Sequence, residues 1–142
     1  SFPTRRSSDL INMFTPEIIT ELKTNEIFVY GSNQFAIHGS GSAKAARDKF
    51  GAIYKDVPMG LCGQSYGIIT KSFNDIPVNL EFISLQVRTL YCFAMLRPEL
   101  TFYCTKIGTA LAWFTIEEIA NVFTSMPFKP SNIILPIEFT KQ

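Results

Sequence analysis

The sequence contains few of the side chains that build disulfide frameworks or metal sites. It has three cysteines, Cys62, Cys92 and Cys104, which form no C-x-x-C pair, and a single histidine, His38. An odd cysteine count without paired spacing excludes a disulfide-stapled or zinc-ribbon class, and it fits the reducing cytoplasm best. The pattern predicts no metal site, and no cofactor is expected.

Long apolar runs and an excess of one charge are also missing. No run approaches the roughly 18 apolar residues that indicate a membrane span, so contact with a membrane is not expected. Thirteen basic residues stand against 12 acidic ones, which gives a formal net charge of +1. Proteins that hold nucleic acid mainly through phosphates carry a visible basic excess, so that class is disfavoured. A chain of 142 residues with 46% hydrophobic and 18% charged residues predicts one folded domain rather than disorder.

The first ten residues differ in composition from the rest and have no helical or strand periodicity. They resemble the translated read-through of a common sequencing adapter; the alternative is a disordered basic arm. We expect residues 1–12 to be a non-native, disordered extension, Met13 to be the natural start, and residues 13–142 to form a single domain. Without Arg5, Arg6 and Asp9, the 13 basic and 12 acidic residues become 11 and 11, so that domain is neutral.

Helix-like and strand-like segments alternate along the remaining chain. Runs of β-branched and aromatic residues bounded by glycine or proline are typical of buried strands. Thr15, Asn79 and the Thr115–Glu118 spacing are typical of helix starts. The alternation predicts an α/β fold with a largely parallel sheet. The expected helices are residues 15–22, 43–50, 79–96 and 116–124, and the expected strands are residues 26–30, 66–70, 100–107 and 132–135.

The expected helix at residues 79–96 is apolar on most of its circumference. Such a helix is either covered on most sides or packs one face against a partner. We expect burial together with some interface, which predicts a homodimer through this helix.

Three unusual segments follow predicted strands, where ligands bind in open α/β sheets. They are the glycine-rich loop at residues 31–41, Lys71, and the loop at residues 108–114. The first loop leads into a helix N-terminus, whose free N–H groups and dipole favour an anion such as a diphosphate. Many glycine-rich loops are only tight turns, so the pattern alone leaves phosphate binding open.

The residues of these segments resemble the macro domain family, whose members bind ADP-ribose. The matching residues are Gly31-Ser32-Asn33 with residues 38–51, Ile68-Ile69-Thr70-Lys71, and Thr105-Lys106-Ile107-Gly108-Thr109-Ala110-Leu111-Ala112. They occur in the family's order over most of residues 25–139. The similarity is strongest to the branch that contains the terminal ADP-ribose protein glycohydrolase and the antitoxin that removes ADP-ribose from DNA. Small phage-encoded macro-like proteins are a still better match.

The resemblance implies a three-layer α/β/α sandwich with an ADP-ribose cleft. Asn33 matches the family's asparagine near the distal ribose, and the glycine-rich loop would bind the diphosphate through its backbone. Lys71 matches the lysine that attacks the ribose C1″ in the glycohydrolase branch, which requires an uncharged amine. Lys71 is therefore the candidate catalytic residue. The candidate ligand-binding residues are Asn33, His38, Gly39, Ser40, Gly41, Gly108, Thr109, Ala110 and Trp113.

The sequence also departs from the family pattern in its second loop. Ala112 stands where the branch has a carboxylate that resolves the lysine adduct, so Glu117, Glu118 or a water would have to replace it. Thr109 replaces a cysteine and Ala110 a glycine. Trp113 replaces a small residue; its side chain would stack on the ligand, fill the cleft, or pack under the loop, and packing is the expected outcome.

Each candidate residue also has an interpretation in which its role is only structural. Lys71 would then be a solvated lysine at a strand end, Asn33 a turn cap, and His38 a loop histidine bonded to backbone. Three functions remain open: an ADP-ribosyl glycohydrolase acting on a modified protein or nucleic acid, a non-catalytic ADP-ribose-binding module, and an interaction protein that has lost the pocket. We weight recognition above catalysis. If a phage encodes the protein, the host cytoplasm is the expected location.

Overall fold

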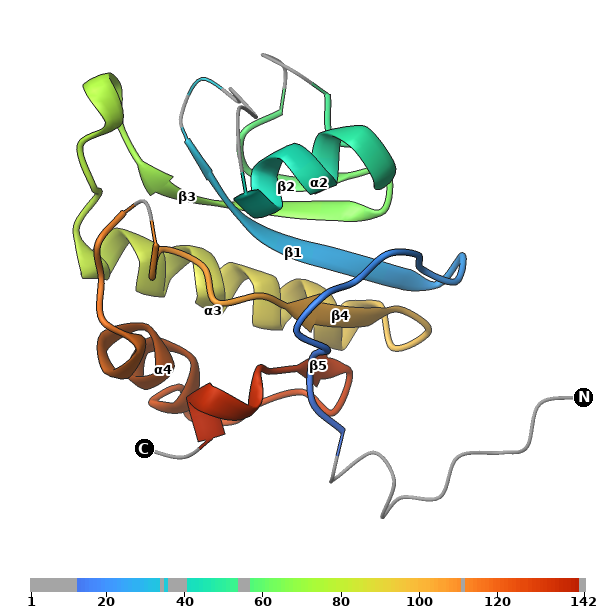
Figure 1. Cartoon of the computed structure of the whole chain (residues 1–142). Coiled ribbons are helices and arrows are strands. Elements are labelled where there is room, and N and C mark those ends of the chain that lie inside the picture. Colours follow the sequence, from blue (N-terminus) through green and yellow to red (C-terminus); the bar gives the residue numbers. More distant parts are fainter. Residues whose placement is uncertain (1–12, 34, 36–40, 54–56, 111, 141–142) are drawn as a thin grey trace, which may run out of the picture.

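A five-stranded mixed sheet forms the centre of the protein (Figure 1). The structure, a computed structural model, describes residues 13–33, 35, 41–53, 57–110 and 112–140, so the predicted extension at residues 1–12 lies outside it. The strand order is β2-β3-β1-β4-β5. The elements are β1 (Glu26–Asn33), α2 (Gly41–Lys49), β2 (Gly60–Cys62), β3 (Ser65–Lys71), η1 (Phe73–Asp75), α3 (Leu80–Leu96), β4 (Thr101–Cys104), α4 (Ile116–Thr124), β5 (Ile133–Ile134) and η2 (Ile137–Thr140).

The direction of the strands confirms an α/β fold with a largely parallel sheet. β1 pairs in parallel with β3 and β4, and β4 pairs in parallel with β5. The short edge strand β2 is the exception, because it pairs antiparallel with β3. The carboxyl ends of β1, β3 and β4 therefore meet at one edge of the sheet, which is the edge that carries the predicted ligand-binding loops.

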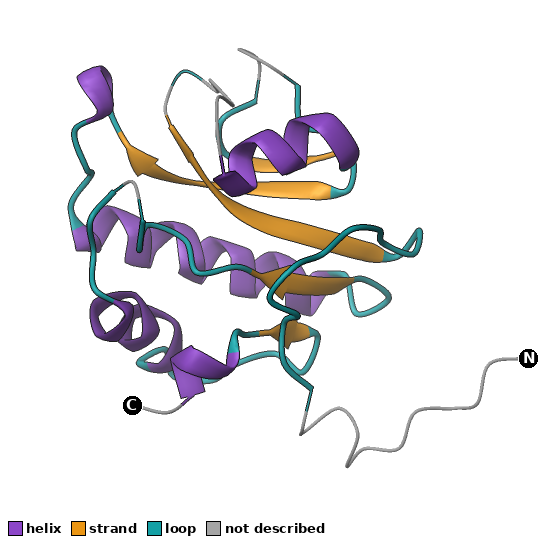
Figure 2. Ribbon diagram, in the orientation of Figure 1, coloured by secondary structure: helices purple, strands orange, loops and turns teal. Residues whose placement is uncertain are grey.

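Helices cover both faces of the sheet (Figure 2). In the central strand β1, Phe28 and Tyr30 pack with Ala46 of α2 on one face. Ile27 and Val29 point to the other face and join the larger core beneath α3 and α4. Successive side chains of a strand alternate between faces, so a strand covered on both sides is apolar throughout. This explains the uninterrupted run Ile27-Phe28-Val29-Tyr30.

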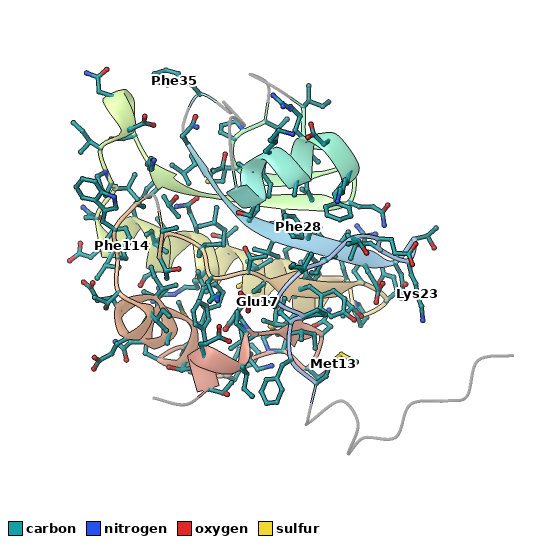
Figure 3. The ribbon with its side chains drawn as sticks, in the orientation of Figure 1. Met13, Glu17, Lys23, Phe28, Phe35 and Phe114 are labelled. Carbon is teal, nitrogen blue, oxygen red and sulfur yellow. The ribbon has the colours of Figure 1, made fainter. Side chains whose placement is uncertain are left out.

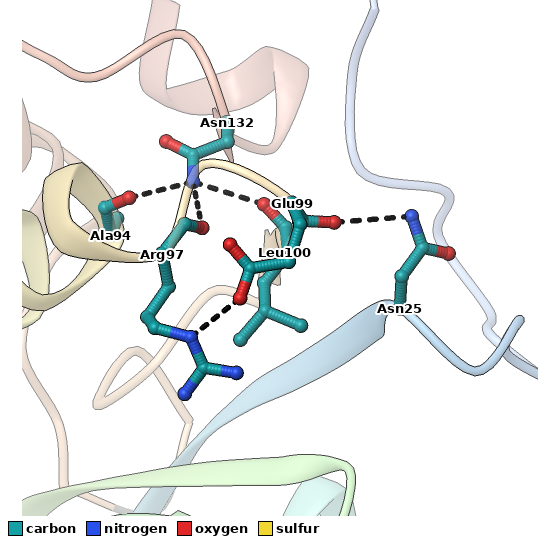
Figure 4. Close-up of polar contacts among 6 residues, drawn as sticks. All are labelled: Asn25, Ala94, Arg97, Glu99, Leu100 and Asn132. Carbon is teal, nitrogen blue, oxygen red and sulfur yellow. Dashed lines mark hydrogen bonds and ion pairs between the residues drawn. The ribbon is translucent and has the colours of Figure 1, made fainter.

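The predicted helix starts at Asn79 and Thr115 are confirmed. The Asn79 Oδ1 accepts a hydrogen bond from the Phe82 N–H at 2.8 Å, and α3 follows directly. Thr115 and Glu118 form a complete capping box at the start of α4. At its other end α3 is held by Asn132, whose Nδ2 donates to the carbonyls of Ala94, Arg97 and Leu100 (Figure 4).

The predicted helix at residues 15–22 is wrong. This segment runs without regular helix alongside β4 and β5 (Figure 1). The Thr15 N–H donates to the Leu135 carbonyl at 2.9 Å, and its hydroxyl donates to the Ile134 carbonyl at 3.1 Å. These long-range bonds hold both the backbone and the side chain of Thr15 against β5 and the residue that follows it. The strands at residues 100–107 and 132–135 exist but are shorter than predicted, since β4 ends at Cys104 and β5 has two residues.

One side of α3 is buried and the opposite side is exposed. Ile83, Val87 and Leu90 lie fully in the core. The exposed stripe contains Leu85, Cys92, Met95 and Leu96. This arrangement is compatible with the predicted homodimer, which remains a prediction because a single chain cannot test it. Among the described residues, no helix is long and apolar enough to cross a membrane.

Candidate functional site

A cleft of about 440 Å³ lies where β1 and β3 end and the chain leaves β4. Its size falls within the range of about 300–1,000 Å³ that is typical of small-molecule sites. Four separate parts of the chain contribute to its wall. The described lining residues are Gly31, Ser32, Asn33, Gly41, Ser42, Ala43, Thr70, Lys71, Asp75, Lys106, Ile107, Gly108, Ala110 and Ala112.

Two glycines let the last residues of β1 and the loop after β4 approach each other at the base of the cleft. A Cβ atom on Gly31 would lie 3.3 Å from the Thr70 Oγ1 and 3.5 Å from the Gly108 N. Gly108 has a φ of +70°, and a Cβ there would lie 3.2 Å from Phe114 Cδ2. The labelled Phe114 lies on this side of the molecule, and Lys23 marks the opposite end of the sheet (Figure 3). Small residues are therefore required for these two segments to form one wall.

A β-bulge places Lys71 beside Asn33. The register runs in step as far as Ser32 opposite Ile69, and Asn33 then pairs with Lys71 instead of Thr70. Two residues of β3 thus oppose one residue of β1, which bends the strand and changes the direction of the following side chain. The Thr70 hydroxyl donates to the Ser32 carbonyl at 3.2 Å and holds the extra residue in place.

Lys71 has an acidic neighbour that sequence reasoning missed. The Lys71 side chain is 16% exposed, and its Nζ lies 3.9 Å from the Oδ1 of Asp75. Asn74 and Asp75 both have positive φ angles, 56° and 60°, and the Ser72 N–H donates to the Ile76 carbonyl across the turn. Asparagine and aspartate tolerate this backbone region better than other non-glycine residues. The Asn-Asp pair, three and four residues after the lysine, was the available signal in the sequence.

Lys106 is a second cation in the cleft that the sequence did not single out. Its Nζ lies 2.8 Å from the Glu138 Oε2 and 3.2 Å from the Glu17 Oε1. Glu17 lies on the N-terminal segment that crosses the sheet (Figure 3). The hydrogen bonds that Lys106 donates to Glu138 and, to a lesser extent, to Glu17 raise the pKa of Lys106, so this side chain carries its charge through the neutral range.

The carboxylates that sequence reasoning offered in place of Ala112 are not among the described lining residues of the cleft. Ala112 itself is 3% exposed and lines the cleft. Glu118 accepts the Thr115 N–H in the capping box, and Glu117 is an exposed residue of the first turn of α4. Among the described lining residues, the carboxylate is Asp75.

The structure brings together most of the predicted residues that it describes. Asn33, Gly41, Lys71, Gly108 and Ala110 all line the cleft. The Asn33 Oδ1 also accepts the Phe35 N–H at 3.0 Å, which is the turn-capping contact considered as its alternative role. His38, Gly39 and Ser40 lie outside the described residues.

Two predicted residues of the second loop have other surroundings. The Thr109 hydroxyl donates to the Lys106 carbonyl at 2.8 Å, so it stabilises its own turn. Trp113 is 84% exposed and has a φ of 66°. The expectation that Trp113 packs under the loop is therefore wrong, and this side chain does not fill the cleft. Such an exposed indole at an unfavourable φ could not be predicted from local sequence.

When the chain was compared with protein-family models, with curated proteins and with solved structures, nothing matched. Among the described residues, no group of three or more histidine, cysteine, aspartate or glutamate side chains is arranged to hold a metal ion.

Proposed function

We propose that this cleft binds ADP-ribose or a related nucleotide-diphosphate-ribose ligand within a macro-domain-like, three-layer α/β/α fold. One observation carries the proposal. The three segments that resemble macro domains are far apart in the sequence, yet Asn33, Lys71 and Gly108 line the same cleft. Convergence of this kind at the carboxyl edge of a parallel sheet is the expected placement of a ligand site.

The proposed diphosphate position is the wall formed by the start of α2. Gly41, Ser42 and Ala43 line the cleft, and the first turn of this nine-residue helix has no acidic side chain. A helix N-terminus attracts anions through its free N–H groups and its dipole. Lys71 and Lys106 line the same cavity, but both have carboxylate neighbours. The proposed attraction for a diphosphate therefore rests mainly on the N–H groups at the start of α2, which do not depend on the net charge of the domain.

A second candidate function is removal of ADP-ribose from a protein or nucleic acid through Lys71. In this reaction Asp75 accepts a proton from Lys71, and the uncharged amine attacks C1″ to form a C1″–N bond. The bond to the leaving group breaks, the leaving group keeps its electron pair, and it receives the proton from Asp75. The 3.9 Å approach of Asp75 to Lys71 favours this candidate, because it supplies a carboxylate for the proton transfers that Ala112 cannot perform. Water would then release the ribose from the lysine. A binding module without turnover is the alternative that Ala112 favours.

The open cleft also bears on the third function, an interaction protein without a pocket. Trp113 would have been the residue to close the cavity, and it is 84% exposed instead. Ala110 lines the cavity without closing it. These two observations favour ligand binding over a fold that has lost its site.

Isothermal titration calorimetry with ADP-ribose tests the binding proposal. The wild type is expected to give a saturable heat signal on titration with ADP-ribose. Ala110→Phe is expected to abolish this signal, because the larger side chain fills the cleft. Lys49→Ala is the matched control, because it removes an exposed lysine from the far end of α2. Absence of binding in the wild type, or equal loss in both variants, would refute the proposal.

A turnover assay separates the enzyme from the binding module. Mono-ADP-ribosylated protein and DNA are each incubated with the wild type, Lys71→Ala and Asp75→Asn. Release of ADP-ribose by the wild type, lost in Lys71→Ala with ADP-ribose affinity retained, supports the covalent route. If the wild type binds ADP-ribose but does not release it from either substrate, the non-catalytic binding module is the remaining function. Glu118→Gln serves as the control and should retain whatever activity is found.

A further inference from the structure

Gln86 is a buried amide in the middle of α3. It is 4% exposed and lies among residues of the apolar core. Its Oε1 accepts the Ile69 N–H at 2.7 Å, and its Nε2 donates to the Ile69 carbonyl at 2.9 Å and to the Phe82 carbonyl at 3.3 Å. A polar side chain in a core needs all its hydrogen bonds, and the amide of Gln86 is bonded at both its oxygen and its nitrogen.

These bonds replace a missing strand. The antiparallel partner β2 pairs with β3 only from Ser65 to Gly67. Ile69 lies two residues further on, so its backbone groups point to the same side of β3, where the described pairing with β2 has already ended. The Gln86 amide presents a donor and an acceptor to Ile69, as a neighbouring strand would do. It therefore closes the outer edge of β3 at this residue.

Ile69, which Gln86 bonds, comes directly before the bulge that sets the direction of the Lys71 side chain. Ile69 still pairs with Ser32, whereas Lys71 pairs with Asn33 after the extra residue. The direction of the Lys71 side chain depends on how the backbone enters this bulge. Ile69 lies opposite Ser32 of β1, and both of its backbone groups are bonded to Gln86. Gln86 therefore holds the entry to the bulge from the outer side of β3.

We propose that Gln86 is a positioning residue for Lys71: through its two bonds to Ile69 it fixes the bulged end of β3 and so keeps the Lys71 amine directed into the cleft. The importance of that amine for a ligand rests on the proposed function, but its placement by Gln86 does not. Without the amide bonds Ile69 loses both partners of its backbone groups, while Thr70 keeps its bonds to Ser32 and Val78. The largely buried Lys71 side chain is then expected to become more accessible and its direction less defined.

Two glutamine-to-methionine variants distinguish a specific effect on the position of Lys71 from a general loss of stability. Gln86→Met retains the length of the side chain and removes its hydrogen bonds. Gln64→Met is the matched control, because the Gln64 Nε2 donates to the carbonyls of Lys23 and Glu26 at 2.6 and 3.2 Å. Those bonds lie at the opposite end of the sheet from the cleft. Both variants lose side-chain-to-backbone hydrogen bonds, but only one loses them beside Lys71.

The readout is the acylation rate of each lysine amine, followed by mass spectrometry over a range of pH without ligand. In Gln86→Met the Lys71 rate is expected to rise by about tenfold or more, because the variant loses both hydrogen bonds to Ile69. The rates of Lys44 and Lys49 should not change. In Gln64→Met the Lys71 rate and its pH profile should match the wild type. An unchanged Lys71 rate in folded Gln86→Met, or an equal rise in both variants, would overturn the proposal.

A measurement on the wild type keeps the proposal testable if Gln86→Met does not fold. The Ile69 amide should exchange its hydrogen as slowly as the central amides of β1, because Gln86 bonds it in the core. Exchange at the rate of an open strand edge would contradict the role of Gln86. Both readouts are independent of ADP-ribose. A raised Lys71 acylation rate in Gln86→Met without ADP-ribose binding by the wild type would therefore refute only the proposed function. ADP-ribose binding by the wild type with an unchanged Lys71 rate in Gln86→Met would refute only the role of Gln86.

Discussion

Replacing Gly108 by alanine tests whether the wall of the cleft needs a glycine for two separate reasons. Gly108 has a φ of +70°, a region that costs an L-residue about 1 to 2 kcal/mol. The new Cβ would also lie 3.2 Å from Phe114 Cδ2 and 3.5 Å from Ile119 Cδ1. Crowding of this kind in a packed region costs about 1 to 3 kcal/mol.

Gly60→Ala is the matched control for this substitution. Gly60 has a φ of +87° and nothing within 4 Å of the Cβ position, so it shares the backbone strain but not the crowding. The effect of alanine on the unfolded chain is the same in both variants and cancels in the difference. Gly108→Ala should therefore be less stable than Gly60→Ala by about 1 to 3 kcal/mol.

Urea denaturation and thermal melting measure this difference. In a domain of this size about 1 kcal/mol corresponds to a shift of about 4 °C in the melting temperature. Equal destabilisation by the two substitutions would show that Phe114 does not contact the loop as described. A Gly108→Ala variant more stable than Gly60→Ala would refute the packing of the wall altogether.

Three further predictions follow from individual contacts. Thr115→Ala removes the N-cap of α4 and should lower the free energy of unfolding by about 1 kcal/mol in urea titrations, whereas no change would contradict the capping box. Glu138 raises the pKa of Lys106, so this pair contributes stability that is present below the unfolded pKa and lost as pH rises through the folded one. The stability difference between wild type and Glu138→Gln should thus shrink above about pH 10.5, and a difference that grows there would have the wrong sign. Burial raises the pKa of the Cys104 thiol, so iodoacetamide should label the exposed Cys92 and spare Cys104 in the folded protein at mildly alkaline pH.

Local signals in the sequence predicted much of the fold. The capping residues Asn79 and Thr115 act on backbone groups within three residues, so their effect is contained in the sequence near them. The apolar run of β1 likewise indicated a buried strand. Thr15 carried the same type of capping signal as Thr115, but its hydroxyl bonds Ile134, 119 residues away. A tertiary contact between residues so far apart outweighs the local preference of Thr15 for a helix start, and the neighbouring sequence does not indicate it.

The site was predicted in part for a similar reason. Asn33 and Lys71 follow predicted strands, and parallel strands bring the segments after their carboxyl ends together at one edge of the sheet. The approach of Asp75 to Lys71 depends on a turn with two consecutive positive φ angles, which the sequence permits but does not require. The ion pairs of Lys106 join it to Glu17 and Glu138 from the two ends of the chain, and their proximity appears only in the fold.

Chemical-shift mapping of the isotope-labelled protein with ADP-ribose tests the proposed function most directly. Saturable shifts are expected at the backbone amides of Ser32, Ala43 and Gly108, which belong to three different segments of the cleft wall. The amides of Leu85 and Met95 on the exposed side of α3 should not move. Absence of saturable shifts, or shifts centred on α3 instead of the cleft, would contradict ADP-ribose binding at this site.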